Sequence, residues 1–132
     1  MTNTNYAEMF AELIVELEDG MRYLNLCPHD TMYEAKDQSF LITFPTVGKD
    51  AALRLPVKST EIEKGGLVFG KTETLDIQLP EEIEGLYYIV PTLIRTTYKD
   101  RKDFISPTTD PKMIIKDERG LTKAVQKFDV NW

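Results

Sequence analysis

The sequence predicts a single α+β domain, built mainly of antiparallel β-sheet with an amphipathic helix at its N-terminus. Residues 1–20 carry apolar side chains at helical spacing, whereas residues 21–132 contain many short apolar runs bounded by Gly or Pro. A chain of 132 residues has the length of one domain and buries about two thirds of its unfolded surface. We therefore expect a helix over residues 1–20 and a β-rich core over residues 21–132.

Charge and cysteine content restrict the classes of function. The net charge is −6, and it changes from nine negative over residues 1–94 to three positive over residues 95–132. The acidic balance argues against general affinity for nucleic acid, but it is compatible with binding of a small anion at one local site. With Cys27 and His29 as the only residues of their types, the sequence predicts no disulfide, no zinc site and no cofactor.

The N-terminal segment does not have the pattern of a secretory signal. Glu8 and Glu12 occupy positions where such a signal is cationic and then apolar, and no apolar run approaches eighteen residues. We expect a cytoplasmic protein without membrane contact.

The first predicted element is a helix from Asn5 to Asp19. Thr4 or Asn5 can cap its start, Glu8 completes an approximate capping box with Asn5, and Gly20 is a natural stop. Its apolar stripe would pack on the domain's own sheet, or alternatively form a dimerisation or docking surface. The stripe consists of Tyr6, Met9, Phe10, Leu13, Ile14 and Leu17.

Strand patterns follow as far as residue 57. Met21–Pro28 reads as a strand, residues 31–33 and 39–44 as a hairpin, and Ala51–Val57 as an extended segment. Cys27 and His29, two residues apart, form the minimum set for thiolate catalysis. A cysteine at a strand end is more commonly a small core residue, so we favour His29 as a hydrogen-bond donor to a ligand over any catalytic role.

The middle of the chain reads as a turn followed by strands. Lys58–Gly66 is polar, and its glycine pair suits a hairpin turn but lacks the spacing of a phosphate loop. Residues 67–69 and 71–79 read as strands. Leu86–Val90 is apolar at nearly every position, as in a strand buried on both faces.

A strand-to-helix transition is predicted at Pro91. Leu93, Ile94 and Tyr98 have helical spacing, and the start of such a helix favours an anion, to which Arg95 would add a bidentate donor. A solvated helix face is the alternative interpretation of the same cation.

The chain closes with a predicted hairpin. Met113–Lys116 reads as a strand, Asp117–Gly120 as a turn, and Leu121–Val130 as a final strand pairing back.

Four segments resemble a group of small uncharacterised proteins of phages and other mobile elements. They are Leu24–His29, Glu84–Pro91, Arg101–Pro107 and Arg119-Gly120. The resemblance implies shared polar residues at His29, Arg101, Asp103 and Arg119, and a location in the host cytoplasm. The chain differs from the group in carrying Cys27 where Thr is common and in having an extra N-terminal helix.

Two functional hypotheses follow, and an enzyme is the third choice because no catalytic constellation reaches a recognisable spacing. By analogy with phage proteins that sequester the nucleotide signals of bacterial defence, the chain would hold a small anionic, nucleotide-like ligand without turning it over. Alternatively, it is an assembly or inhibitor protein that acts through a protein–protein surface, with oligomerisation through the N-terminal helix or a sheet edge. The ligand residues would be His29, Arg95, Arg101, Asp103 and Arg119, with Tyr87 or Tyr98 for stacking.

Overall fold

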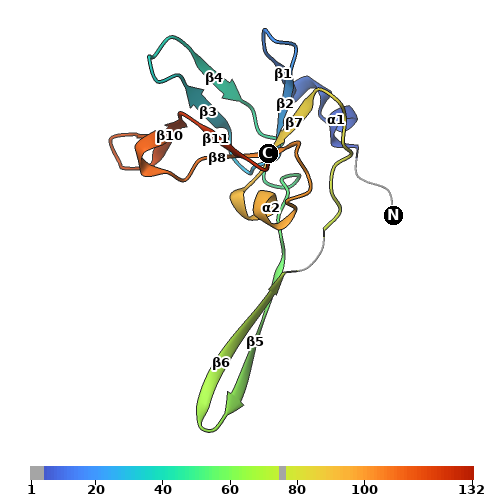
Figure 1. Ribbon diagram of the computed structural model, residues 1–132, viewed down its shortest axis with the longest axis vertical. Coiled ribbons are helices and arrows are strands. Elements are labelled where there is room, and N and C mark those ends of the chain that lie inside the picture. The colour runs from blue at the N-terminus through green and yellow to red at the C-terminus, as the bar shows by residue number, and fades with distance from the viewer. Residues whose placement is uncertain (1–4, 75–76) are drawn as a thin grey trace.

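The computed structural model describes residues 5–74 and 77–132, and it is mostly β-sheet with short helices (Figure 1). This agrees with the predicted α+β class. The helical elements are α1 (Tyr6–Met9), η1 (Ala11–Leu13), α2 (Thr92–Thr97) and η2 (Pro111–Met113), where η marks a 3₁₀ turn. The strands are β1 (Val15–Glu16), β2 (Arg22–Asn25), β3 (Thr31–Glu34), β4 (Leu41–Phe44), β5 (Val57–Lys64), β6 (Leu67–Thr74), β7 (Leu86–Ile89), β8 (Phe104–Pro107), β9 (Ile114–Lys116), β10 (Thr122–Val125) and β11 (Phe128–Val130).

The largest sheet has five strands in the order β1-β2-β7-β8-β11. Its three central strands run parallel, and only the outer strands β1 and β11 pair antiparallel. The prediction of a mainly antiparallel sheet is therefore wrong for this centre. The reason is α2, which connects β7 to β8, because a strand, a helix and a neighbouring strand in one sheet form a parallel crossover.

A second sheet has four strands in the order β4-β3-β10-β9. The predicted hairpin of β3 and β4 is confirmed, with Thr31 opposite Phe44 and Glu34 opposite Leu41. The predicted single strand Leu121–Val130 is wrong, because it divides into β10 and β11, which join different sheets. The chain changes sheet at Gln126 and Lys127, between the two strands.

The five-stranded sheet has a hydrophobic cluster on each face. In β7, Leu86 and Tyr88 belong to one cluster, and Tyr87 and Ile89 belong to the other. This alternation explains why the predicted strand Leu86–Val90 is apolar at successive positions, and that prediction is confirmed. The first cluster is covered by α2 through Ile94, and the second by the four-stranded sheet through Phe44.

The N-terminal helix is much shorter than predicted. Asn5 caps α1 by accepting a hydrogen bond from the Glu8 amide at 3.2 Å, as expected, but the helix ends at Met9. Val15 and Glu16 form β1 instead of a fourth helical turn. These residues fit the apolar spacing of a helix and also that of a strand, because alternate positions 13, 15 and 17 are apolar. Pairing with β2 favours the strand. Gly20, with φ +83°, lies in the turn between β1 and β2.

The region before β7 differs most from its prediction. Ala51 and Ala52 lie in a turn and residues 53–56 are not in a strand, so an extended strand over Ala51–Val57 is not formed. Lys58–Lys64, predicted as part of a polar turn, instead belongs to β5, and β6 runs without a break to Thr74. The predicted continuation of this strand to residue 79 is wrong at residues 77–79, which are not in a strand, while positions 75 and 76 lie outside the described residues.

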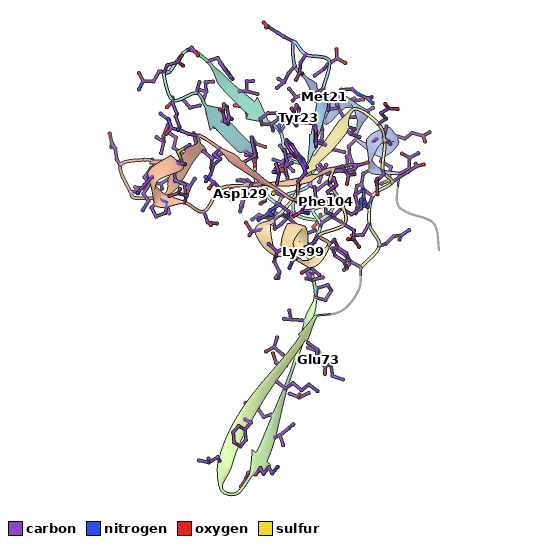
Figure 2. All side chains as sticks on the ribbon, viewed as in Figure 1. Met21, Tyr23, Glu73, Lys99, Phe104 and Asp129 are labelled. Atoms are coloured by element: carbon purple, nitrogen blue, oxygen red, sulfur yellow. The ribbon has the colours of Figure 1, made fainter. Side chains whose placement is uncertain are left out.

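The β5–β6 hairpin, which we call the arm, projects from the rest of the molecule, which we call the body (Figure 1). Each strand has eight residues, which corresponds to about 27 Å of extended chain. All eight residues of β5 are exposed, and Figure 2 shows the side chains of the arm pointing into solvent away from the body. No helix in the described part of the chain is long and apolar enough to cross a membrane.

Candidate functional site

Arg101 and Asp103, two of the predicted ligand residues, are brought together as an ion pair. Arg101 is buried, and its Nε and Nη2 atoms donate to both carboxylate oxygens of Asp103 at 2.9 and 2.7 Å. The guanidinium also lies 4.4 Å from the ring centroid of Phe104 and 3.3 Å from a carboxylate oxygen of Glu82. These internal contacts occupy the Nε–Nη2 edge of the guanidinium, through which it would otherwise hold an anion with two hydrogen bonds.

Arg95 is likewise engaged within the fold. Its Nε donates to the Ser106 hydroxyl at 2.7 Å, and its Nη1 donates to the Val130 carbonyl at 3.2 Å and the Asn131 Oδ1 at 3.0 Å. The side chain therefore ties α2 to β8 and to the end of β11. The predicted helix after Pro91 is confirmed, but at six residues it is too short to build an anion site at its start.

His29 and Arg119 are both exposed, and they lie on different turns. Arg119 reaches Asp117 at 3.8 Å in the turn before β10, and its backbone amide donates to the same carboxylate. Near His29, burial raises the pKa of the Cys27 thiol to about 12, so the thiol stays protonated at neutral pH. This protonation agrees with the choice of Cys27 as a packing residue.

Of the five predicted ligand residues, the contacts described join only Arg101 and Asp103. The cavity of about 530 Å³ beside Asp103 is lined by Glu82, Glu84 and Asp103 against one cation, Lys102. Carboxylates repel an anion, so this cavity does not suit the expected ligand. A nucleotide-like ligand held by all five residues stays a prediction that these contacts do not support.

Of the tyrosines considered for stacking, Tyr87 stacks on Tyr23 with 5.6 Å between ring centroids. The hydroxyl of Tyr98 accepts a hydrogen bond from the Ile77 amide at 3.4 Å. Both side chains therefore already have partners inside the fold.

Two asparagines that sequence reasoning missed organise the turns around the predicted residues. Buried Asn25 accepts from the Cys27 amide at 2.9 Å and donates to the Phe44 carbonyl at 2.9 Å. Asn131 donates to the carbonyls of Arg95 and Arg101 at 3.1 Å each, beside the end of α2. Asparagines suit such turns because they bond to the backbone, but only the fold supplies their distant partners.

The arm presents two faces of opposite charge. Because Ile62 pairs with Phe69 and Lys64 pairs with Leu67, these four side chains share one face. We call it the cationic face, and it comprises Lys58, Thr60, Ile62, Lys64, Leu67, Phe69, Lys71 and Glu73. The other face carries Glu61 and Glu63, with Val68 opposite Glu63. The cationic face thus combines three lysines with three exposed large apolar side chains.

A groove in the body has complementary chemistry. It encloses about 460 Å³ between the β1–β2 turn and β4, and we call it the acidic groove. Its apolar lining comes from Leu17, Phe40 and Ile42, and its charge comes from Glu18 and Asp19. Phe40 is half exposed, and its ring lies 5.8 Å from that of Tyr33, so the groove adjoins the core between the sheets.

The chain matches no known protein family model, no curated protein and no solved structure. Function is therefore inferred from the geometry of the described residues. Within residues 5–74 and 77–132, no group of three or more His, Cys, Asp or Glu side chains is arranged to hold a metal ion. Among the described residues, the arm and the acidic groove are two surfaces without an evident structural role.

Proposed function

We propose that this chain is a protein-interaction module that docks onto a protein partner through its arm. This is the assembly or inhibitor class of function. The observation that carries the proposal is the arm itself, a hairpin of two eight-residue strands whose apolar side chains lie in solvent. Ile62, Leu67 and Phe69 are each at least half exposed.

Physical chemistry supports docking of this hairpin. An isolated two-stranded hairpin is marginally stable in water, because neither of its faces is buried. Its outer edges also present backbone groups that can pair with another strand. Contact with a partner would bury the apolar side chains of the hairpin. The free energy gained by this burial would stabilise the hairpin in the docked state.

The charge of the arm favours a protein over a nucleic acid. Val57–Thr74 contains three lysines and three glutamates, so the arm as a whole is neutral. Phosphate neutralisation, which dominates binding to nucleic acids, therefore gains little here. Apolar side chains interleaved with charges are typical of protein interfaces, where apolar anchors supply affinity and charges supply orientation.

Site-specific photo-crosslinking tests the proposal. A benzophenone amino acid replaces Phe69 on the cationic face. In a matched variant it replaces Val68, the preceding residue, which lies on the opposite face. We expect a covalent protein adduct from position 69 and little from position 68, in the purified protein or in cells that express it. Absence of an adduct at position 69, or equal adducts at both positions, would contradict docking through the cationic face.

A further inference from the structure

We propose that the partner of the arm is a second copy of this chain, whose acidic groove receives the cationic face. This inference rests on the proposed docking role of the arm and adds the identity of its partner. It follows from the match in chemistry between two surfaces of the same molecule and from their positions at opposite ends of it.

The two surfaces are complementary in charge and in apolar character. On the cationic face, the pair Ile62 and Phe69 lies between Lys64 and Lys71, each on a neighbouring rung of the hairpin. In the groove, the apolar lining is bordered by two carboxylates from the β1–β2 turn. An apolar pair flanked by cations therefore meets an apolar groove edged by anions, which sets both affinity and orientation.

The charge distribution of the whole chain also favours this partner. The arm is neutral, so the net charge of −6 belongs to the residues outside it, which carry thirteen Lys/Arg against nineteen Asp/Glu. Because each body carries this negative charge, two bodies repel each other when they approach in an arbitrary orientation. The cationic face, with three lysines and one glutamate, is attracted to a body of that sign. The encounter of two copies is therefore directed to contacts that include the arm.

The arm cannot reach the groove of its own chain. The arm extends from one end of the long axis of the molecule, and β1 and β4, which border the groove, lie at the other end (Figure 1). Two chains lying antiparallel about a two-fold axis bring each arm to the other's groove, so both pairs of surfaces are used at once. Such closed two-fold dimers are the commonest soluble oligomers.

Sedimentation equilibrium on the full chain provides the first test. We expect a particle of twice the 15.2 kDa chain mass that dissociates as ionic strength rises, because the attraction is partly electrostatic. A chain that remains monomeric at concentrations up to the millimolar range would overturn the proposal.

Charge reversal identifies the contact. Glu18→Lys in the groove and Lys64→Glu on the arm should each weaken association by about tenfold or more, because each sets like charges against each other. Combined in one chain, Glu18→Lys with Lys64→Glu should restore association to within about threefold of the original, as expected for directly coupled residues. Failure of the combination to restore association would overturn the pairing of these two surfaces.

Matched apolar variants separate the contact from general effects. Phe69→Ser on the cationic face and Phe40→Ser in the groove should weaken association, whereas Val68→Ser and Leu41→Ser should not. Leu41 is as exposed as Phe40, at 50% and 49%, but does not line the groove. Equal effects of all four substitutions would overturn the proposed interface.

The crosslinking variant distinguishes failure of this inference from failure of the proposed function. An adduct of two chains, joined from position 69 to the groove, supports both. An adduct with a different protein while the chain alone stays monomeric overturns the second-copy partner and leaves docking by the arm intact. No adduct at all contradicts both.

Discussion

In the body, apolar side chains of the five-stranded sheet meet packed neighbours on both faces, whereas in the arm the apolar side chains meet solvent on both. Phe104 in β8 has no exposed surface, and Phe69 in β6 is 50% exposed. The two phenylalanines are alike in chemistry and both lie in strands. Their difference shows that strand formation and core formation are separate outcomes in this chain.

The comparison indicates what each region contributes. The body is stabilised by burial of apolar surface on both sides of β7, while the arm gains little from burial within its own chain. Exposed apolar residues that add little to stability inside the molecule point to contacts outside it. Folding is therefore expected to depend on the body, and association on the arm.

The largest expected difference is between the free energies of unfolding of two alanine variants, one at Phe104 and one at Phe69. Phe104→Ala removes a fully buried ring and should lower the free energy of unfolding by about 3–5 kcal/mol. Phe69→Ala should change it by less than about 0.5 kcal/mol, as for an exposed residue. Urea unfolding of both variants, in a Glu18→Lys background that suppresses association, measures the difference. Similar losses for both would show that the arm contributes to the stability of the body.

The next effect concerns two arginines that sequence reasoning assigned to one ligand. Arg101→Ala leaves the Asp103 carboxylate, whose side chain is 13% exposed, without its bidentate partner, and should cost roughly 3 kcal/mol. Arg119→Ala, with a side chain 79% exposed, should cost less than about 0.5 kcal/mol. Thermal unfolding compares the two. A stable Arg101→Ala protein would restore Arg101 as a candidate ligand residue.

The smallest effect is expected from removing the arm. Val57 and Thr74 are paired across the base of the hairpin, so an Asn-Gly turn can replace residues 58–73. The free energy of unfolding of the shortened chain should stay within about 1 kcal/mol of the original, since the arm shares few contacts with the body. Chemical denaturation measures it, and sedimentation should show that self-association is lost. Unfolding of the shortened chain would contradict the separation of the two regions.

Local patterns predicted part of the body. The capped start of α1, the β3–β4 hairpin, the buried β7 and the helix after Pro91 all depend on neighbours in sequence. The direction of the central strands was predicted wrongly, although the helix that requires a parallel crossover was itself predicted. The length of the N-terminal helix was wrong because its residues also fit a strand, and only β2 distinguishes the two.

The candidate site was less predictable than the fold. Arginines near motif positions indicated a local anion site, but the chemistry of an arginine depends on which partners the fold brings to it. Arg95 and Arg101 find acceptors at Ser106, Asn131 and Asp103. The arm was missed because β5 is polar at most positions. A strand is recognised by apolar residues on a buried face, and without such a face the polar pattern of β5 resembles that of a turn.

By itself, the sequence determined the class of the fold, the strand and helix around Pro91, and the acidic charge of the chain, because these depend on composition and near neighbours. Only the tertiary structure decided that Lys58–Lys64 is a strand, that two predicted ligand arginines are internal partners, and that a cationic apolar face and an acidic apolar groove lie at opposite ends of one molecule. The partners of Arg95 and the placement of the two surfaces depend on residues far apart in sequence, whose contacts no local pattern contains. The β5 strand and the Arg101–Asp103 pair form between near neighbours, but a polar strand has the same local pattern as a turn, and a paired arginine the same pattern as a ligand residue.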